Sequence, residues 1–221
     1  MCTNEKMNRG KMLVMATAMA ATLATAANAD VFTDSAAFNA ANPGLTLIDF
    51  EGFVGPGDFT GNANEFFSGQ GVSFSLPDDP GFWTVIDGPN GDFEFPTSVL
   101  TPNTFSAPIQ ISFTGEVASV GFNVAVVDFI NFPATSANVT IEVFNNNALL
   151  ASESFETGLF TEFTDFRGFS NLGNNITSIL ITPVGDFPVL AIDNLSFGSV
   201  PAPGSLAILG LGGLVGGRRR R

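Results

Sequence analysis

The chain of 221 residues contains no histidine, no tyrosine and a single cysteine, Cys2. Without histidine there is no Ser-His-Asp triad, no Cys-His pair, no HExxH zinc site and no imidazole general base. Paired carboxylates, as in glycoside hydrolysis, are the catalytic chemistry that the composition still allows. Asp78-Asp79 and Asp92 with Glu94 are the candidates, although no spacing selects them over the other acids.

Basic residues are almost absent from the middle of the chain. Between Asp30 and Ser199 the only one is Arg167, whereas every acidic residue except Glu5 lies in this stretch. So acidic a domain repels phosphate backbones, which excludes nucleic-acid binding. The acidity favours cations such as calcium, or a surface suited to saline water. We expect Arg167 to pair with a neighbouring carboxylate, Asp165 or Glu162.

The first 29 residues have the pattern of a secretory signal peptide. Three basic residues precede an alanine-rich apolar run over residues 13–27, and the sequence Ala27-Asn28-Ala29 provides an A-x-A cleavage site. We expect signal peptidase to cut between Ala29 and Asp30. A buried N-terminal helix is the alternative. Cleavage would remove Cys2 and leave a mature protein without disulfides.

Residues 30–199 predict one all-β domain. Asp34 is a helix N-cap, and the short N-terminal helix that it begins should end before Pro43-Gly44. After it, runs of β-branched and Phe residues alternate with polar ones between turn residues. The clearest apolar faces are Ile109, Ile111 and Phe113; Val120, Phe122, Val124 and Val126; and Val139, Ile141 and Val143.

Strands with one apolar face bury it against a second sheet, which predicts an antiparallel β-sandwich, jelly-roll-like in type. A closed barrel is the alternative. The sequence FNNNALL, residues 144–150, predicts a hairpin, because asparagine tolerates positive φ. Residues 78–104 are rich in Pro, Gly and Asp and predict long loops around one or two brief strands. In these loops Trp83 is a candidate platform for a sugar ring, with Asp87 and Asp92 accepting hydrogen bonds from hydroxyls; the alternative is a Trp83 buried in the core.

Residues 200–221 predict a transient membrane anchor. A proline hinge precedes fourteen uncharged residues, 204–217, which as a helix would measure about 21 Å against a hydrocarbon core of about 30 Å. The chain ends in four basic residues that would stay on the cytoplasmic side, namely Arg218, Arg219, Arg220 and Arg221.

This tail, with Pro201-Ala202-Pro203, the apolar run and the arginine cluster, resembles the PEP-CTERM sorting signal of exported bacterial proteins. Ala202 replaces the glutamate of that motif. The resemblance implies removal of the anchor by an exosortase, and a cell-surface or extracellular location in a biofilm or exopolysaccharide matrix. It implies a structural or glycan-binding role. The lack of histidine, of a cysteine in the mature protein and of a catalytic motif argues against an enzyme; the alternative is a carbohydrate-active enzyme that uses loop carboxylates on the same scaffold.

Two segments of the domain, residues 32–52 and 176–198, resemble segments of small PEP-CTERM proteins, which are similar to galactose-binding-like, carbohydrate-binding sandwiches. In such folds the first and last strands lie side by side and ligate a structural calcium ion. By position, this resemblance implies Glu51 and Asp193 as calcium ligands, with extracellular polysaccharide as the partner. Alternatively, Asp193 caps a strand or turn and Glu51 is solvated.

Overall fold

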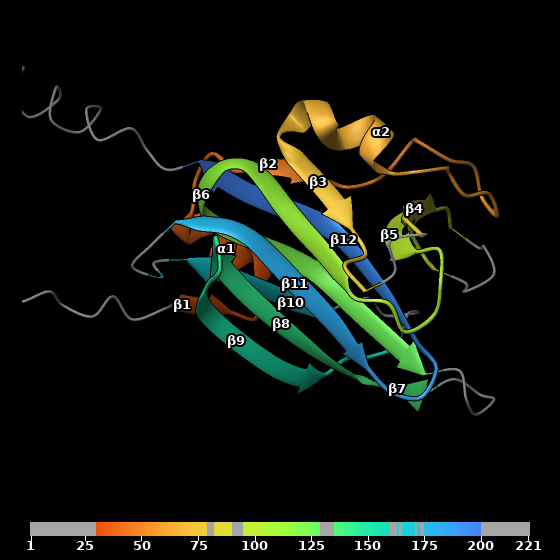
Figure 1. Ribbon diagram of the computed structural model, residues 1–221. Helices are drawn as coiled ribbons and strands as arrows, with labels where there is room; N and C mark the ends of the chain where they lie inside the picture. Colours follow the sequence, from red (N-terminus) through yellow and green to blue (C-terminus); the bar gives the residue numbers. More distant parts are fainter. Residues whose placement is uncertain are drawn as a thin grey trace, which may run out of the picture.

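The computed structural model describes residues 30–78, 82–89, 95–128, 135–159, 163, 165–170, 172 and 175–199. Within them lie twelve strands and three short helices (Figure 1). In chain order these are β1 (Asp30–Phe32), α1 (Ser35–Ala41), β2 (Thr46–Ile48), α2 (Asn64–Phe67), the 3₁₀ helix η1 (Ser68–Gln70), β3 (Val72–Ser75), β4 (Thr84–Asp87), β5 (Val99–Pro102), β6 (Ile109–Asp128), β7 (Thr135–Ser136), β8 (Asn138–Asn145), β9 (Ala148–Glu156), β10 (Phe166–Ser170), β11 (Ile176–Val184) and β12 (Pro188–Ser199).

The strands form an antiparallel, sandwich-like arrangement that is joined through β6. The first residues of β6 pair with β3 and β11, and the residues from Val117 onward pair with β10 and β12. Between these two parts, residues 114–116 are exposed, and the ladder with β11 jumps from Val117 to Ser112. Strand β6 therefore folds over near its middle and passes from one layer to the other (Figure 1).

One layer contains β3, the start of β6, β11, β8 and β9, and the other contains β1, β10, the rest of β6, β12, β5 and β4. The path of strands ends at β4 and β9, which do not pair with each other in the described part of the chain. The expectation of an all-β, antiparallel fold is confirmed, and this path does not close into the alternative barrel.

The main core fills the space between the layers. It contains all ten residues of the three apolar faces expected from the alternation, and thus confirms them. The opposite face of β6 and β12 is covered as well, because a smaller core of Phe95, Val99, Ala125, Val127, Val189 and Ala191 packs there. The central strands of this layer are therefore buried on both faces.

Helix α1 packs flat on the outside of β10 and β6. It begins as expected, since the Asp34 carboxylate accepts a hydrogen bond from the Ala37 amide at 2.7 Å. Its buried residue, Phe38, lies over Gly121 and Gly168, which face each other across the two strands. A Cβ atom on Gly168 would lie 2.5 Å from the Phe38 ring, and one on Gly121 would lie 2.8 Å from it. Glycine is required at both positions for the helix to approach so closely.

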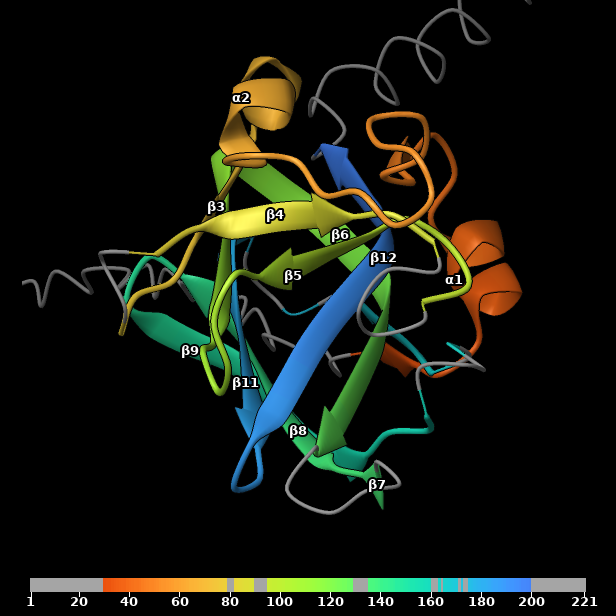
Figure 2. The same cartoon turned by 90° about the vertical axis from the view of Figure 1, so that its right-hand side faces the viewer.

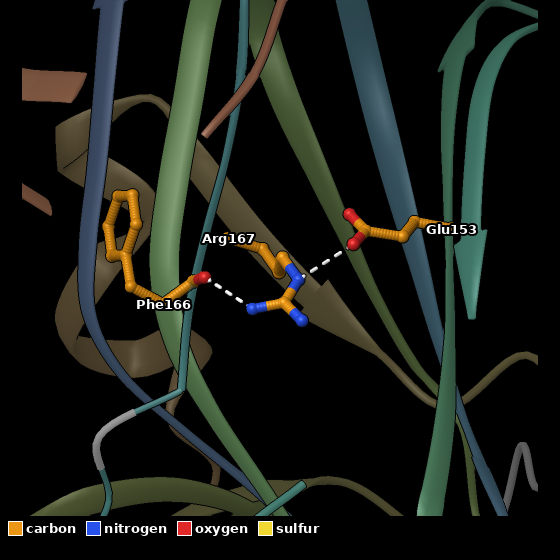
Figure 3. A network of polar contacts seen from close by, with 3 residues as sticks. All are labelled: Glu153, Phe166 and Arg167. Carbon is orange, nitrogen blue, oxygen red and sulfur yellow. Dashed lines mark hydrogen bonds and ion pairs between the residues drawn. The ribbon is translucent and has the colours of Figure 1, made fainter. Parts of the chain in front are cut away.

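The only basic residue of the domain joins the two layers at one edge. Arg167 on β10 binds Glu153 on β9, with 2.9 Å between Nε and Oε1, and its Nη1 donates to the Phe166 carbonyl oxygen at 2.8 Å (Figure 3). The guanidinium carbon also lies 3.4 Å from the centroid of the Phe155 ring. Asp165 and Glu162 were the expected partners of Arg167. Among the described residues Arg167 instead pairs with Glu153 on a different strand, and Asp165 accepts from the Gly158 amide. Glu162 lies outside the described residues.

Other local expectations are met in part. The hairpin joins β8 and β9 with Asn146 at a φ of 52°, and β4 and β5 are the brief strands of the loop region. Helix α2 was not expected; the Asn64 side chain fixes it to β3 through hydrogen bonds with both backbone groups of Phe74. No helix in the described residues is long and apolar enough to cross a bilayer. The signal peptide and the sorting tail, with its predicted transmembrane helix, lie outside those residues.

Candidate functional site

The structure brings Glu51 and Asp193 to the same place. Strand β2 pairs antiparallel with β12, with Ile48 opposite Leu195, so the residues that follow β2 lie beside those that precede Leu195. Glu51 lies beyond the end of β2, in a turn rather than on the strand. Two consecutive residues of the segment before β5 then hold the two carboxylates, Ser98 binding Glu51 and Thr97 binding Asp193.

All four carboxylate oxygens of this pair accept hydrogen bonds. The Ser98 amide donates to Glu51 Oε1 at 3.0 Å and the Ser98 hydroxyl donates to Oε2 at 3.2 Å. Thr97 Oγ1 donates to Asp193 Oδ2 at 3.1 Å. The Asn194 amide donates to Asp193 Oδ1 at 2.6 Å, and the Asn194 side chain donates to Oδ2 at 3.0 Å. Bonds of this kind favour the charged form of a carboxylate.

The environment of Asp193 nevertheless works against its charge. Its side chain is buried, with 4% of its surface exposed. The pKa of Asp193 is raised from 3.8 to about 6, chiefly by the loss of water on burial; the hydrogen bonds from Asn194 and Thr97 lower it, and the carboxylates of Glu51 and Asp49 raise it. Three acids thus lie near one another, while the only basic residue between Asp30 and Ser199, Arg167, is bound to Glu153 elsewhere.

Two of the five non-glycine residues with a positive φ in the described part of the chain lie at the same place. Phe50, between Asp49 and Glu51, has a φ of 57° although its side chain is fully buried, and Asn194 has a φ of 52°. Positive φ is rare for a bulky residue, and such strain persists only where the surrounding packing imposes it. Phe50 is held by ring contacts with Phe67 and Phe74, and Asn194 lies where the ladder between β12 and β6 shifts register. The strained residues Phe50 and Asn194 are the immediate neighbours of Glu51 and Asp193, whose carboxylates lie at this site.

This site offers carboxylate oxygens of the kind that bind calcium, but too few of them to hold the ion alone. Carboxylate oxygens are the hard ligands that calcium prefers. Within the described residues, however, no group of three or more His, Cys, Asp or Glu side chains is arranged to hold a metal ion. Glu51 and Asp193 would therefore supply only part of a coordination shell, and backbone carbonyls or water would have to supply the remainder.

A second feature is a groove over the outer side of β4 and β5, which we call the aromatic groove. It measures about 540 Å³, and its lining includes Phe59, Val85, Asp87, Thr101, Asn103, Thr104, Phe105 and Val189. The Phe59 side chain is 74% exposed and that of Phe105 is 48% exposed. The groove thus combines two exposed aromatic rings, of which Phe105 contacts Phe187, with the Asn103 amide and the Thr104 hydroxyl. Asp87 and Thr101 also line it but are buried, with 7% and 2% of their surface exposed.

Two of the three residues expected to bind glycan lie in or next to this groove. Asp87 lines it, and its backbone pairs with that of Phe59. Trp83 is 44% exposed and is therefore not a core residue. Its backbone exchanges two hydrogen bonds with Asn103, which lines the groove, through the Asn103 side chain and the Asn103 amide. Asp92 lies outside the described residues, as do Asp79 and Glu94.

Phe59 and Phe105 were not predicted as site residues from the sequence. Both stand in short segments rich in turn residues, GDFTG and PNTFS, where no alternation would bury a large apolar side chain. That mismatch is the signal that could have identified them.

No known protein family model matches this chain, and no curated protein resembles it significantly in sequence. The likeness of the tail to a PEP-CTERM signal and of the domain to carbohydrate-binding sandwiches therefore remains a prediction.

The raised pKa of Asp193 predicts how stability changes with pH in the absence of divalent cations. Between pH 3.8 and about 6 the folded state keeps a proton that the unfolded state releases, so the free energy of unfolding falls as the pH rises through this window. The contribution of Asp193 is about 2–3 kcal/mol. We expect Asp193→Asn to remove this part of the fall in urea titrations with chelator at pH 4 and pH 7. Asp186→Asn, which changes the same charge at an exposed turn, is the control; an equal effect of both variants would contradict the prediction.

Proposed function

We propose that the protein is an exported component of a cell surface or extracellular matrix whose domain binds polysaccharide through the aromatic groove. The observation that carries the proposal is that two exposed aromatic rings, Phe59 and Phe105, line the same groove as Asp87 and Asn103. Sugar rings present C–H faces to aromatic rings and hydroxyls to polar groups, so this lining suits them. On this proposal the sandwich is of the jelly-roll-like, galactose-binding kind.

The lining of the aromatic groove suits glycan binding better than glycan hydrolysis. Glycoside hydrolysis requires two carboxyl groups on either side of the scissile bond. Among the described residues that line the aromatic groove, Asp87 is the only one with a carboxyl group. The rival function, a carbohydrate-active enzyme on the same scaffold, would need a second acid, for which the candidates are Asp78, Asp79, Asp92 and Glu94.

Calcium is the cation that we propose for Glu51 and Asp193. The repulsion among these two carboxylates and Asp49, in a domain with one basic residue, supports a bound cation. A divalent ion there would join the start of the domain, through Glu51, to its last strand, and so stabilise the fold.

Export and sorting are proposed from the two ends of the chain. Signal peptidase would remove residues 1–29, and an exosortase would release the protein from its transient anchor after acting on the tail that follows Pro201-Ala202-Pro203.

The glycan proposal predicts saturable binding to at least one polysaccharide on a glycan array, without release of reducing sugar. Phe59→Ala and Trp83→Ala should each weaken the affinity about tenfold or more, which corresponds to about 1.4 kcal/mol, because each removes an exposed ring from the groove or its border. Leu149→Ala removes a similarly exposed apolar side chain from β9 and should have no effect. Unchanged affinity in both aromatic variants would remove the groove from the proposal, and product release would favour the enzyme.

The calcium proposal predicts a higher melting temperature with calcium than with chelator at constant ionic strength. At a hundredfold excess over Kd the gain is about 2.7 kcal/mol. Glu51→Gln and Asp193→Asn should abolish the shift, whereas Asp186→Asn should keep it. A shift of equal size in all variants would indicate general screening of the acidic surface, and no shift in the wild type would defeat the site.

The export proposal predicts that a host with an exosortase holds the protein at its surface or in the medium, beginning at Asp30 and lacking Arg218 to Arg221. Terminal peptides identified by mass spectrometry in each cell fraction test this. An uncut chain in the cytosol would overturn it.

A further inference from the structure

A second groove lies on the outer side of the same layer, between α1, the segment around β2 and the end of β12. It measures about 520 Å³ and is lined by four asparagines, Asn39, Asn42, Asn123 and Asn194, together with two serines, two leucines, Gly44 and Phe166. We call it the amide groove. None of its lining residues is charged, although the domain is strongly acidic.

Three of the asparagines are oriented by bonds within the protein. The side-chain nitrogen of Asn42 donates to the Phe38 carbonyl at 2.9 Å, and that of Asn123 donates to the Phe163 carbonyl at 3.3 Å. The side-chain nitrogen of Asn194 donates to Asp193 at 3.0 Å. With their nitrogens engaged, the three Oδ1 oxygens remain as acceptors, and none accepts a hydrogen bond from the described residues.

These features select a class of ligand. Amide oxygens with unused lone pairs suit a ligand that brings several O–H donors. The surrounding acids disfavour an anion, and an uncharged lining gives a cation no carboxylate. Leu47, which is 56% exposed, adds an apolar surface against which a sugar ring can lie. We propose that the amide groove is a second binding site, specific for neutral polyhydroxylated ligands, that is, for uncharged sugar units rather than uronates.

Both grooves lie along β12, on the side that faces away from the main core. Val189 lines the aromatic groove, and Asn194 and Ser196 line the amide groove, while Leu190, Ile192, Leu195 and Phe197 point into the core. The two groups are separated by about 20 Å along the strand. Figure 2 shows β12 running between α1 on one side and β5 on the other. A single glycan chain that engages both grooves would bind more tightly than either groove alone allows. This gain rests on the proposed function, whereas binding at the amide groove does not.

The test is an NMR titration of the purified mature protein with a panel of soluble neutral oligosaccharides of glucose, galactose and mannose, and with alginate oligosaccharides as uronate probes. Phe59→Ala is used as the background, so that binding at the aromatic groove is weakened. We expect at least one neutral probe to shift the side-chain amide signals of Asn42, Asn123 and Asn194 in saturable fashion. The alginate probes should not shift them.

The double variant Asn39→Ala/Leu47→Ala should weaken this binding at least about fivefold, because it removes two exposed side chains of the groove that make no hydrogen bond with the described residues. Asn147→Ala/Leu149→Ala, the same two residue types exposed on the β8–β9 hairpin, is the matched control and should bind as the background does. The proposal fails if no neutral probe shifts the three amides, if alginate binds equally well, or if the double variant retains full affinity. None of these results affects the conclusion of the glycan-array test of the aromatic groove. Conversely, loss of array binding in Phe59→Ala does not affect the NMR test of the amide groove.

Discussion

The pairing of β6 with both layers is the constraint on which the rest of the structure depends. One continuous strand of 20 residues forms ladders with β3 and β11 in one layer and with β10 and β12 in the other. The layers are thereby fixed relative to each other by backbone hydrogen bonds as well as by the core between them. Arg167, bound to Glu153 and stacked on Phe155, joins them again at an edge.

Pairing with β6 fixes the position of β12, and β12 in turn contributes residues to both grooves and to the carboxylate pair. The ladder with β6 is regular from Pro188 to Asp193, then shifts before Ser196. This irregularity is what lets Asp193 and Asn194 leave the regular alternation, with Asn194 at positive φ, while Leu195 returns to the core. A regular strand would place one of these residues among the apolar side chains of the main core, where a carboxylate or an amide would lack partners.

The carboxylate site departs from the consistency of the rest of the domain. Asp193 and Asp87 are the two buried acids among the described residues, and Asp193 in addition lies near two other acids and beside a strained, buried phenylalanine. Two processes relieve such repulsion, the uptake of a proton and the binding of a cation. Both processes act on the same carboxylates, so they compete. A bound cation would lower the pKa of Asp193, and a proton on Asp193 would weaken the binding of the cation.

The strand faces could be predicted from sequence because alternation is a local pattern: Val120, Phe122, Val124 and Val126 occupy one side whatever the rest of the chain does. The short helix after Asp34 was predictable for the same reason, through its cap. The partner of Arg167 was not, because Glu153 comes close only through the packing of β9 against β10. Spacing also gives no sign that Thr97 and Ser98 would hold Asp193 and Glu51; that pair was expected only by resemblance, whereas the grooves depend on loops whose side chains follow no period.

On the proposal that both grooves bind sugars, their shape favours a polymer as the ligand. Each is open to solvent and exposes the side chains that would contact a ligand, such as Phe59 in one and Leu47 in the other, so each alone would bury little of a small molecule and bind it weakly. Two weak sites on one side of one strand gain strength only from a ligand long enough to reach both, because the second contact then forms at a high effective concentration. A chain of repeated sugar units meets that condition, and a single sugar does not. The same arrangement would leave the protein free to move along a polysaccharide by releasing one groove at a time, which suits a component of a hydrated matrix better than a receptor for a soluble sugar.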